Sequence, residues 1–104
     1  MVEVVWTASA IQDLNDIAEY IAKDSVRYAE ITTEELFSTT NILETHPKSG
    51  TKVPEFRDES IRQLIRGNYR IVYKIMSTER IDILTVHNCA RLISNIKSSK
   101  NKND

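Results

Sequence analysis

The sequence has little of what builds covalent cross-links, metal sites or membrane anchors. Its single cysteine, Cys89, excludes an internal disulfide bond and a cysteine-rich zinc site. The two histidines, His46 and His87, lie far apart, and no Asp or Glu spacing around them suggests metal ligation. No apolar run approaches the roughly 18 residues of a membrane span, and the first residues lack the pattern of a signal peptide. We therefore expect a cytoplasmic protein with no cofactor, metal or membrane contact.

Glycine and proline are also scarce, with two of each in 104 residues. Because irregular segments depend on these residues, most of the chain is expected to be helix or strand. The length suffices for one domain and is too short for two. We expect a single domain over residues 1–97 and a polar tail over residues 98–104.

The net charge of −1 hides two halves of opposite sign. Residues 1–46 contain two basic and nine acidic side chains, whereas residues 47–104 contain twelve basic and six acidic ones. The total argues against a nucleic-acid-binding protein. A partner meets one face of a protein and not the sum of its charges, so the basic half is a candidate surface for a partner.

The first half predicts one strand and a pair of helices. The segment Val2–Trp6 is β-branched and aromatic, as in strands, and Thr7 offers a hydroxyl N-cap. Apolar residues then recur every three or four positions until the helix ends near Asp24. A second helix is expected from Val26 to about Thr45, although four threonines weaken its propensity, so it must rely on packing. The short connection makes the two helices an antiparallel hairpin.

The second half predicts a long loop followed by strands. The loop runs from His46 to about Ser60 and is the only segment long enough to be a functional loop. Strands are expected at Ile61–Arg66, Tyr69–Met76 and Ile81–Val86, followed by a short helix containing Ala90, Ile93 and Ile96. The order β-α-α-β-β-β predicts an α+β fold in which the helical hairpin packs on a twisted, mostly antiparallel sheet.

The connection Gly67-Asn68, with glycine first, is typical of a type II′ turn and fixes the register of the central hairpin. One face of this hairpin then carries Arg62, Leu64, Arg66, Tyr69, Ile71 and Tyr73. The other face carries Ile61, Gln63, Ile65, Arg70, Val72 and Lys74. Two interpretations stay open: a surface that binds phosphate or an acidic peptide, or long basic side chains that pair with the acidic helices.

No motif in the sequence specifies a reaction. It has no nucleophile elbow, no phosphate-binding loop and no Cys–His signature. His87 stands at a strand end, where a structural role is more common than a catalytic one. From the residues alone, the sequence predicts a fold and a polarised charge.

Several segments together resemble the ParE/RelE superfamily, the toxins of bacterial type II toxin–antitoxin modules. The resemblance covers about residues 2–93 and implies the fold described above. No single motif is strong, but the combination of Val-Pro-Glu with a later Tyr-Arg-Ile-Val-Tyr is characteristic. The matching residues are Val5-Trp6-Thr7, Asp13-Leu14, Ile17, Tyr20-Ile21-Ala22, Asp24-Ser25, Pro47, Gly50, Val53-Pro54-Glu55, Arg62, Tyr69-Arg70-Ile71-Val72-Tyr73, His87 and Arg91-Leu92.

The RelE-like branch of this superfamily contains ribosome-dependent ribonucleases that cleave messenger RNA with basic side chains. Of the positions that the resemblance carries over, only Arg70 keeps its residue type. The lysine positions fall on Ile61 and Gln63, the late arginine falls near Cys89, and Asn95 stands near the place of the C-terminal tyrosine. A YoeB-like variant of the mechanism uses Glu, Arg and His. That alternative would draw on Glu55, on Arg62 or Arg70, and on His87.

The ParE-like branch contains inhibitors of DNA gyrase that perform no chemistry themselves. The Val-Pro-Glu loop and the Trp-Thr start favour this branch, so the resemblance implies a growth-arresting, plasmid-stabilising toxin that is not an enzyme. A degenerate, non-toxic module that only binds an antitoxin is a further alternative.

The resemblance also implies a cognate antitoxin whose C-terminal segment folds on the toxin. Operator DNA is then bound only through the antitoxin. The expected antitoxin-binding residues are the basic Arg62, Arg66 and Arg70 and the apolar Ile61, Ile65 and Val72. The last helix, with Ile93 and Ile96, is expected to cover this apolar face in the free toxin.

Overall fold

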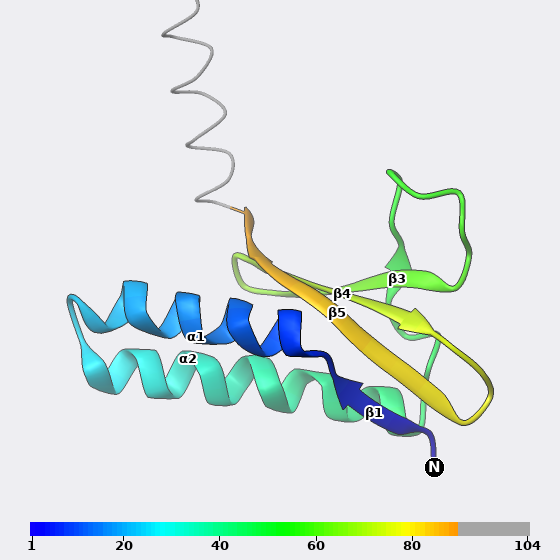
Figure 1. The fold of residues 1–104 in the computed structure, drawn as a ribbon, viewed down its shortest axis with the longest axis horizontal. Helices are drawn as coiled ribbons and strands as arrows, with labels where there is room; N and C mark the ends of the chain where they lie inside the picture. The colour runs from blue at the N-terminus through cyan, green and yellow to red at the C-terminus, as the bar shows by residue number, and fades with distance from the viewer. Residues whose placement is uncertain (90–104) are drawn as a thin grey trace, which may run out of the picture.

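The structure is a computed structural model and describes residues 1–89. A helical layer packs against one face of a five-stranded sheet with the strand order β1-β5-β4-β3-β2 (Figure 1). The elements are β1 Glu3–Trp6, α1 Ala8–Ala22, α2 Val26–Thr39, the 3-10 helix η1 Thr40–Glu44, β2 Thr51–Lys52, β3 Ile61–Arg66, β4 Tyr69–Ile75 and β5 Arg80–Asn88. The predicted α+β fold is therefore confirmed. The expected last helix (Ala90, Ile93, Ile96) and the tail lie outside the described residues.

Side-chain caps set the starts of both helices. Thr7 accepts a hydrogen bond from the Ala10 amide at 3.2 Å, as the sequence predicts, and Ser25 caps α2 in the same way through the Tyr28 amide at 3.0 Å. The apolar spacing predicts that the second helix continues to about residue 45, but in the structure α2 ends at Thr39. It tightens into η1 at Thr40, whose hydroxyl donates to the Phe37 carbonyl at 2.8 Å. This short-range bond competes with the α-helical pattern.

The register of the β3–β4 hairpin is the predicted one at all six pairs, from Ile61 opposite Lys74 to Arg66 opposite Tyr69. Gly67 has a φ of +58°, whereas no non-glycine residue described has a positive φ. A type I′ turn needs a positive φ at both central residues, so the geometry agrees with the predicted type II′ turn.

The first strand pairs with the last one. β1 runs parallel to β5, with Glu3 opposite Arg80 and Trp6 opposite Ile83. The helical hairpin and the strands β2, β3 and β4 all lie between these two strands in the sequence. The other strand pairs in the described sheet are antiparallel. This arrangement places α1 over β5, and the core lies between the two layers. Its fully buried side chains include Leu36, Leu43, Ile71, Tyr73, Ile81 and Ile83.

The predicted loop over residues 46–60 contains a strand that the sequence does not reveal. Thr51 and Lys52 pair antiparallel with Gln63 and Arg62 and form β2. Both β2 residues are exposed, so no apolar pattern marks the strand. A buried contact sets the pairing instead: the Gly50 amide donates to the Tyr73 hydroxyl at 3.0 Å.

Candidate functional site

The face of the sheet that turns away from the helices carries most of the predicted functional residues. Ile71 and Tyr73 point into the core, and side chains alternate along a strand, so Arg70, Val72 and Lys74 lie on the opposite, helix-free face. The connection between β2 and β3 projects from this side of the sheet (Figure 1). We call its residues 53–60 the acidic loop, after Glu55, Asp58 and Glu59.

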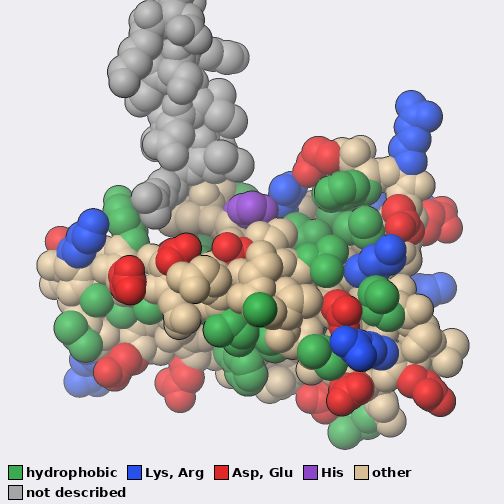
Figure 2. Space-filling view, viewed as in Figure 1, with side chains coloured by type: hydrophobic (Ala, Val, Ile, Leu, Met, Phe, Trp, Pro, Cys, Tyr) green, Lys and Arg blue, Asp and Glu red, His purple; other side chains and the backbone are tan. Residues whose placement is uncertain are grey.

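The acidic loop supplies a carboxylate to each of three nearby cations. Glu55 Oε2 lies 3.0 Å from Arg70 Nη1, and Asp58 Oδ2 lies 3.8 Å from Lys74 Nζ. Glu59 Oε1 lies 2.8 Å from Lys52 Nζ. Figure 2 shows Lys or Arg side chains next to Asp or Glu side chains at this end of the molecule. Three of the basic side chains of the second half are thus paired with carboxylates of the same half.

The structure brings Glu55, Arg70 and His87 together. Arg70 and His87 are cross-strand partners on β4 and β5, and Glu55 pairs with the Arg70 guanidinium. Thr85 Oγ1 lies 3.4 Å from His87 Nε2, next along β5 on the same face. The glutamate, arginine and histidine of the YoeB-like alternative therefore lie on one surface, with Arg70 and not Arg62 as the arginine.

Arg62 and Arg66 lie on the helix-facing side of the hairpin. Arg62 is half-buried, and its Nη1 donates to the Gly50 carbonyl at 2.9 Å. Arg66 Nη2 lies 3.9 Å from Glu35 Oε2 on α2. Pairing with the acidic helices therefore holds for Arg66, whereas Arg70 pairs with the acidic loop. The three predicted basic anchors face two different sides of the sheet.

The apolar residues expected to bind the antitoxin differ in exposure. Ile65 is 60% exposed, whereas Val72 is 4% exposed and Ile61 is half-buried. Ile65 lies opposite Arg70 in the hairpin. On the helix-free face, Ile65 is thus the most exposed of the three apolar residues, and Arg70 beside it has 23% of its side chain exposed.

Hydrogen bonds and ion pairs lower the pKa values of two carboxylates of the acidic loop, Asp58 and Glu59. The side chain and backbone amide of Ser60 bond to Asp58 and, with Lys74 nearby, hold the pKa of Asp58 below its usual range. The Lys52 ammonium lowers the pKa of Glu59. On the core side, burial raises the pKa of Tyr73, so its phenol stays protonated and donates to the Pro47 carbonyl at 2.8 Å.

These lowered pKa values predict an acid-sensitive loop. Because the folded pKa lies below the unfolded one, the contribution of Asp58 and Glu59 is present above about pH 4 and is lost as the pH falls through the folded pKa. NMR titration of both carboxyls should give pKa values below those of model peptides. Asp58→Asn should move the amide signals of residues 53–60, and Asp24→Asn, at an exposed helix end, should leave them in place. Carboxyls that titrate as in peptides would contradict the ion pairs.

The chemistry available to this face is limited. Glutamate, arginine and histidine can act as base, electrostatic stabiliser and acid in ribonucleolytic cleavage. Here the charge of Arg70 is already paired with Glu55, and the nearby β3 positions hold the uncharged Ile61 and Gln63. The described residues contain no group of three metal-ligating side chains. None of the helices of residues 1–89 is long and apolar enough to span a membrane.

Asp13 is among the residues that carry the family resemblance, but the sequence does not indicate what its side chain contacts. Asp13 on α1 reaches β5, where its Oδ2 accepts hydrogen bonds from Thr85 Oγ1 at 2.6 Å and from the Val86 amide at 3.0 Å. The helical pattern marks Asp13 only as a residue outside the apolar stripe. Its role follows from the packing of α1 against the end of β5.

Comparison with known proteins gives matches at the level of sequence family and of fold. The family described as "ParE toxin of type II toxin-antitoxin system, parDE" matches residues 4–93. A chain of the chromosomal ParDE toxin–antitoxin system from P. aeruginosa is 20% identical, with a TM-score of 0.68 over 85% of this chain and 96% of that chain. A chain of the toxin–antitoxin complex RelBE2 from Mycobacterium tuberculosis is 26% identical, with a TM-score of 0.54 over 85% and 93%. No curated protein matches the sequence.

Proposed function

Because the chain belongs to the ParE toxin family of type II toxin–antitoxin systems, we propose that it inhibits DNA gyrase and is neutralised by a cognate antitoxin. The family match carries this proposal, since it spans the helical hairpin, the acidic loop and the sheet. The same match confirms the superfamily that the sequence resembles. We place the toxin in the cytoplasm, where gyrase acts, as one domain over residues 1–97.

The charge of the helix-free face supports gyrase over the ribosome as the target. A protein that binds RNA phosphates gains affinity from uncompensated Lys and Arg side chains. On this face, Arg70 and Lys74 are each paired with a carboxylate of the acidic loop. An inhibitor that acts by contact with a protein needs no such excess of positive charge.

The antitoxin partner is supported by the structural neighbours, whose descriptions name a toxin–antitoxin system and a toxin–antitoxin complex. We propose that the antitoxin binds the predicted residues Arg62, Arg66, Arg70, Ile61, Ile65 and Val72. Ile65 and Arg70 come first, because they lie side by side on the helix-free face. In this proposal the antitoxin binds the operator DNA, and the toxin does not contact the DNA directly.

Purified toxin should stop gyrase from supercoiling relaxed plasmid DNA. We also expect cleaved DNA to accumulate, and prior mixing with the antitoxin should restore supercoiling. In cells, induction without antitoxin should block DNA synthesis before translation and arrest growth. Unimpaired supercoiling at a large excess of toxin would refute gyrase as the target.

A ribosome-dependent messenger RNA endoribonuclease is the second candidate, because Glu55, Arg70 and His87 share one surface. It requires codon-positioned cuts in a translating extract that disappear in Arg70→Ala and in His87→Ala. Arg66→Ala is the matched control, since Arg66 pairs with Glu35 on the helix-facing side. Intact messages at excess toxin would eliminate this candidate. If the chain binds the antitoxin but its expression does not arrest growth, the result would support the remaining alternative, a non-toxic module that only binds the antitoxin.

A further inference from the structure

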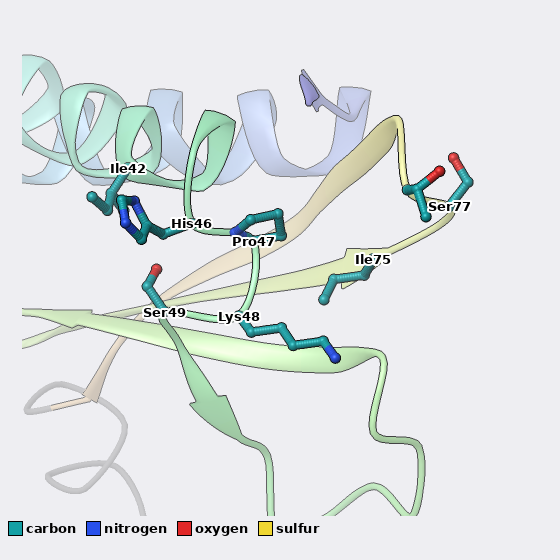
Figure 3. A pocket seen from close by; sticks show the side chains of 8 residues that line it. Ile42, His46, Pro47, Lys48, Ser49, Ile75 and Ser77 are labelled. Atoms are coloured by element: carbon teal, nitrogen blue, oxygen red, sulfur yellow. The ribbon is translucent and has the colours of Figure 1, made fainter. Parts of the chain in front are cut away.

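A hollow of about 830 Å³ opens at the end of the sheet, between the segment that follows η1 and the end of β4 (Figure 3). In Figure 3, Pro47, Ile75 and Lys48 surround a shared space, with Ile42 and His46 toward one end and Ser77 toward the other. The volume lies within the range of ligand-binding pockets in proteins. The hollow shares no lining residue with the Glu55–Arg70–His87 cluster.

Carbon atoms form most of the surface of this hollow, and its apolar side chains are Ile42, Pro47 and Ile75. Ile75 packs against the hydrophobic core with part of its surface and lines the hollow with the rest. Ile42 on η1 also lines the hollow and is 43% exposed. Apolar surface that is concave and open to water is typical of a site that another apolar group completes.

A cation without a partner lies at the edge of this apolar surface. Lys48 forms no hydrogen bond or ion pair with the described residues, whereas Lys52, Lys74 and Arg80 each lie within 4.0 Å of a carboxylate. Glu59 interacts with Lys48 only through a weak electrostatic attraction, because its carboxylate accepts a hydrogen bond from Lys52. An occupant that combines an apolar side chain with a carboxylate therefore fits both features of the hollow.

We propose that the hollow is a docking site for a segment of the antitoxin in which an apolar side chain stands next to acidic residues. The proposal rests on the proposed function for the existence of that partner. The chain's own segment outside the described residues is a poor occupant, because residues 90–104 contain four basic side chains and one acidic one. Such a segment would bring positive charge to Lys48.

Calorimetric titration with the purified cognate antitoxin tests the proposal. Lys48→Glu replaces attraction by repulsion, and Ile42→Asp places a carboxylate in the apolar wall. Each should weaken binding by about tenfold or more. Arg27→Glu makes the same change of charge at an exposed residue of α2 and should change the affinity less than about twofold. Both hollow residues are exposed, and circular dichroism checks that the variants fold.

Hydrogen exchange on the wild-type complex gives a second readout that needs no variant. Bound antitoxin should protect the backbone amides of residues 48–49 and 75–78. Equal affinity of all variants, or no protection there, would overturn the docking site and leave the toxin–antitoxin assignment standing. Wild-type toxin that fails to bind the antitoxin would overturn both. A toxin dimer that Lys48→Glu dissociates would assign the hollow to a second copy instead.

Discussion

Gly50→Ala is expected to lower the free energy of unfolding by about 3 kcal/mol, because an added methyl group has no room. A Cβ at this position would lie 2.5 Å from the Gln63 carbonyl oxygen and 2.7 Å from the Tyr73 hydroxyl. The carbonyl belongs to the β3 backbone, which cannot move without disturbing the sheet. The bond from the Gly50 amide to the Tyr73 hydroxyl would be lost as well.

Urea unfolding and thermal melting check this result, with an expected fall in Tm of about 10 °C or more for a domain of this size. Gly67→Ala is the matched control. Gly67 has a φ of +58°, but an added Cβ would meet no atom within 4 Å, so only the backbone strain of about 1 kcal/mol is expected. Equal stability of the two variants would show that the segment before β2 adapts freely.

Asp13→Ala is expected to lower the free energy of unfolding by about 2 kcal/mol. The substitution removes the carboxylate that accepts hydrogen bonds from the edge of β5. β1 ends opposite Ile83, and β5 continues beyond it without a neighbouring strand on that side among the described residues. There the Asp13 carboxylate accepts the Val86 amide at 3.0 Å and the Thr85 hydroxyl at 2.6 Å. Val86 is buried, so the loss leaves its N–H group without an acceptor and away from water.

Two variants separate this effect from a general effect of charge. Asp13→Asn keeps one acceptor oxygen and should cost about half as much. Asp16→Ala removes an exposed carboxylate one turn further along α1, where it bonds to the Gln12 side chain, and should stay within about 0.5 kcal/mol of wild type. Equilibrium denaturation of all three gives the comparison. Asp13→Ala and Asp16→Ala of equal stability would contradict the bridging role.

Local chemistry made part of the fold predictable. The glycine-first turn at Gly67-Asn68 fixes its neighbours within a few residues, so the register of the hairpin followed from the sequence. Thr7 as an N-cap was equally local. The strand β2 was not predictable, because its two exposed residues carry no pattern and its pairing depends on Gly50 meeting Tyr73, 23 residues away in sequence.

The candidate site also has a part that the local sequence predicts and a part that depends on long-range contacts. The turn sequence alone predicts Arg70 and Arg62 on opposite faces of the hairpin, and that placement is confirmed. The contact between Arg70 and Glu55 depends on the path of a loop, and no turn rule specifies that path. His87 joins them only because β5 pairs with β4 along the strand as far as Asn88. Long-range packing therefore assembles the cluster from residues that the sequence names singly.

The parallel pairing of β1 with β5 has a consequence for the synthesis of the toxin. The hydrogen bond from Thr7 to Ile83 joins residues 76 positions apart. Contacts of such long range form late and slow the folding of small domains. A nascent chain that ends before β5 leaves its first strand without a partner and α1 without the strand that it covers. Interrupted translation of this gene therefore yields chains that lack the fold of the toxin.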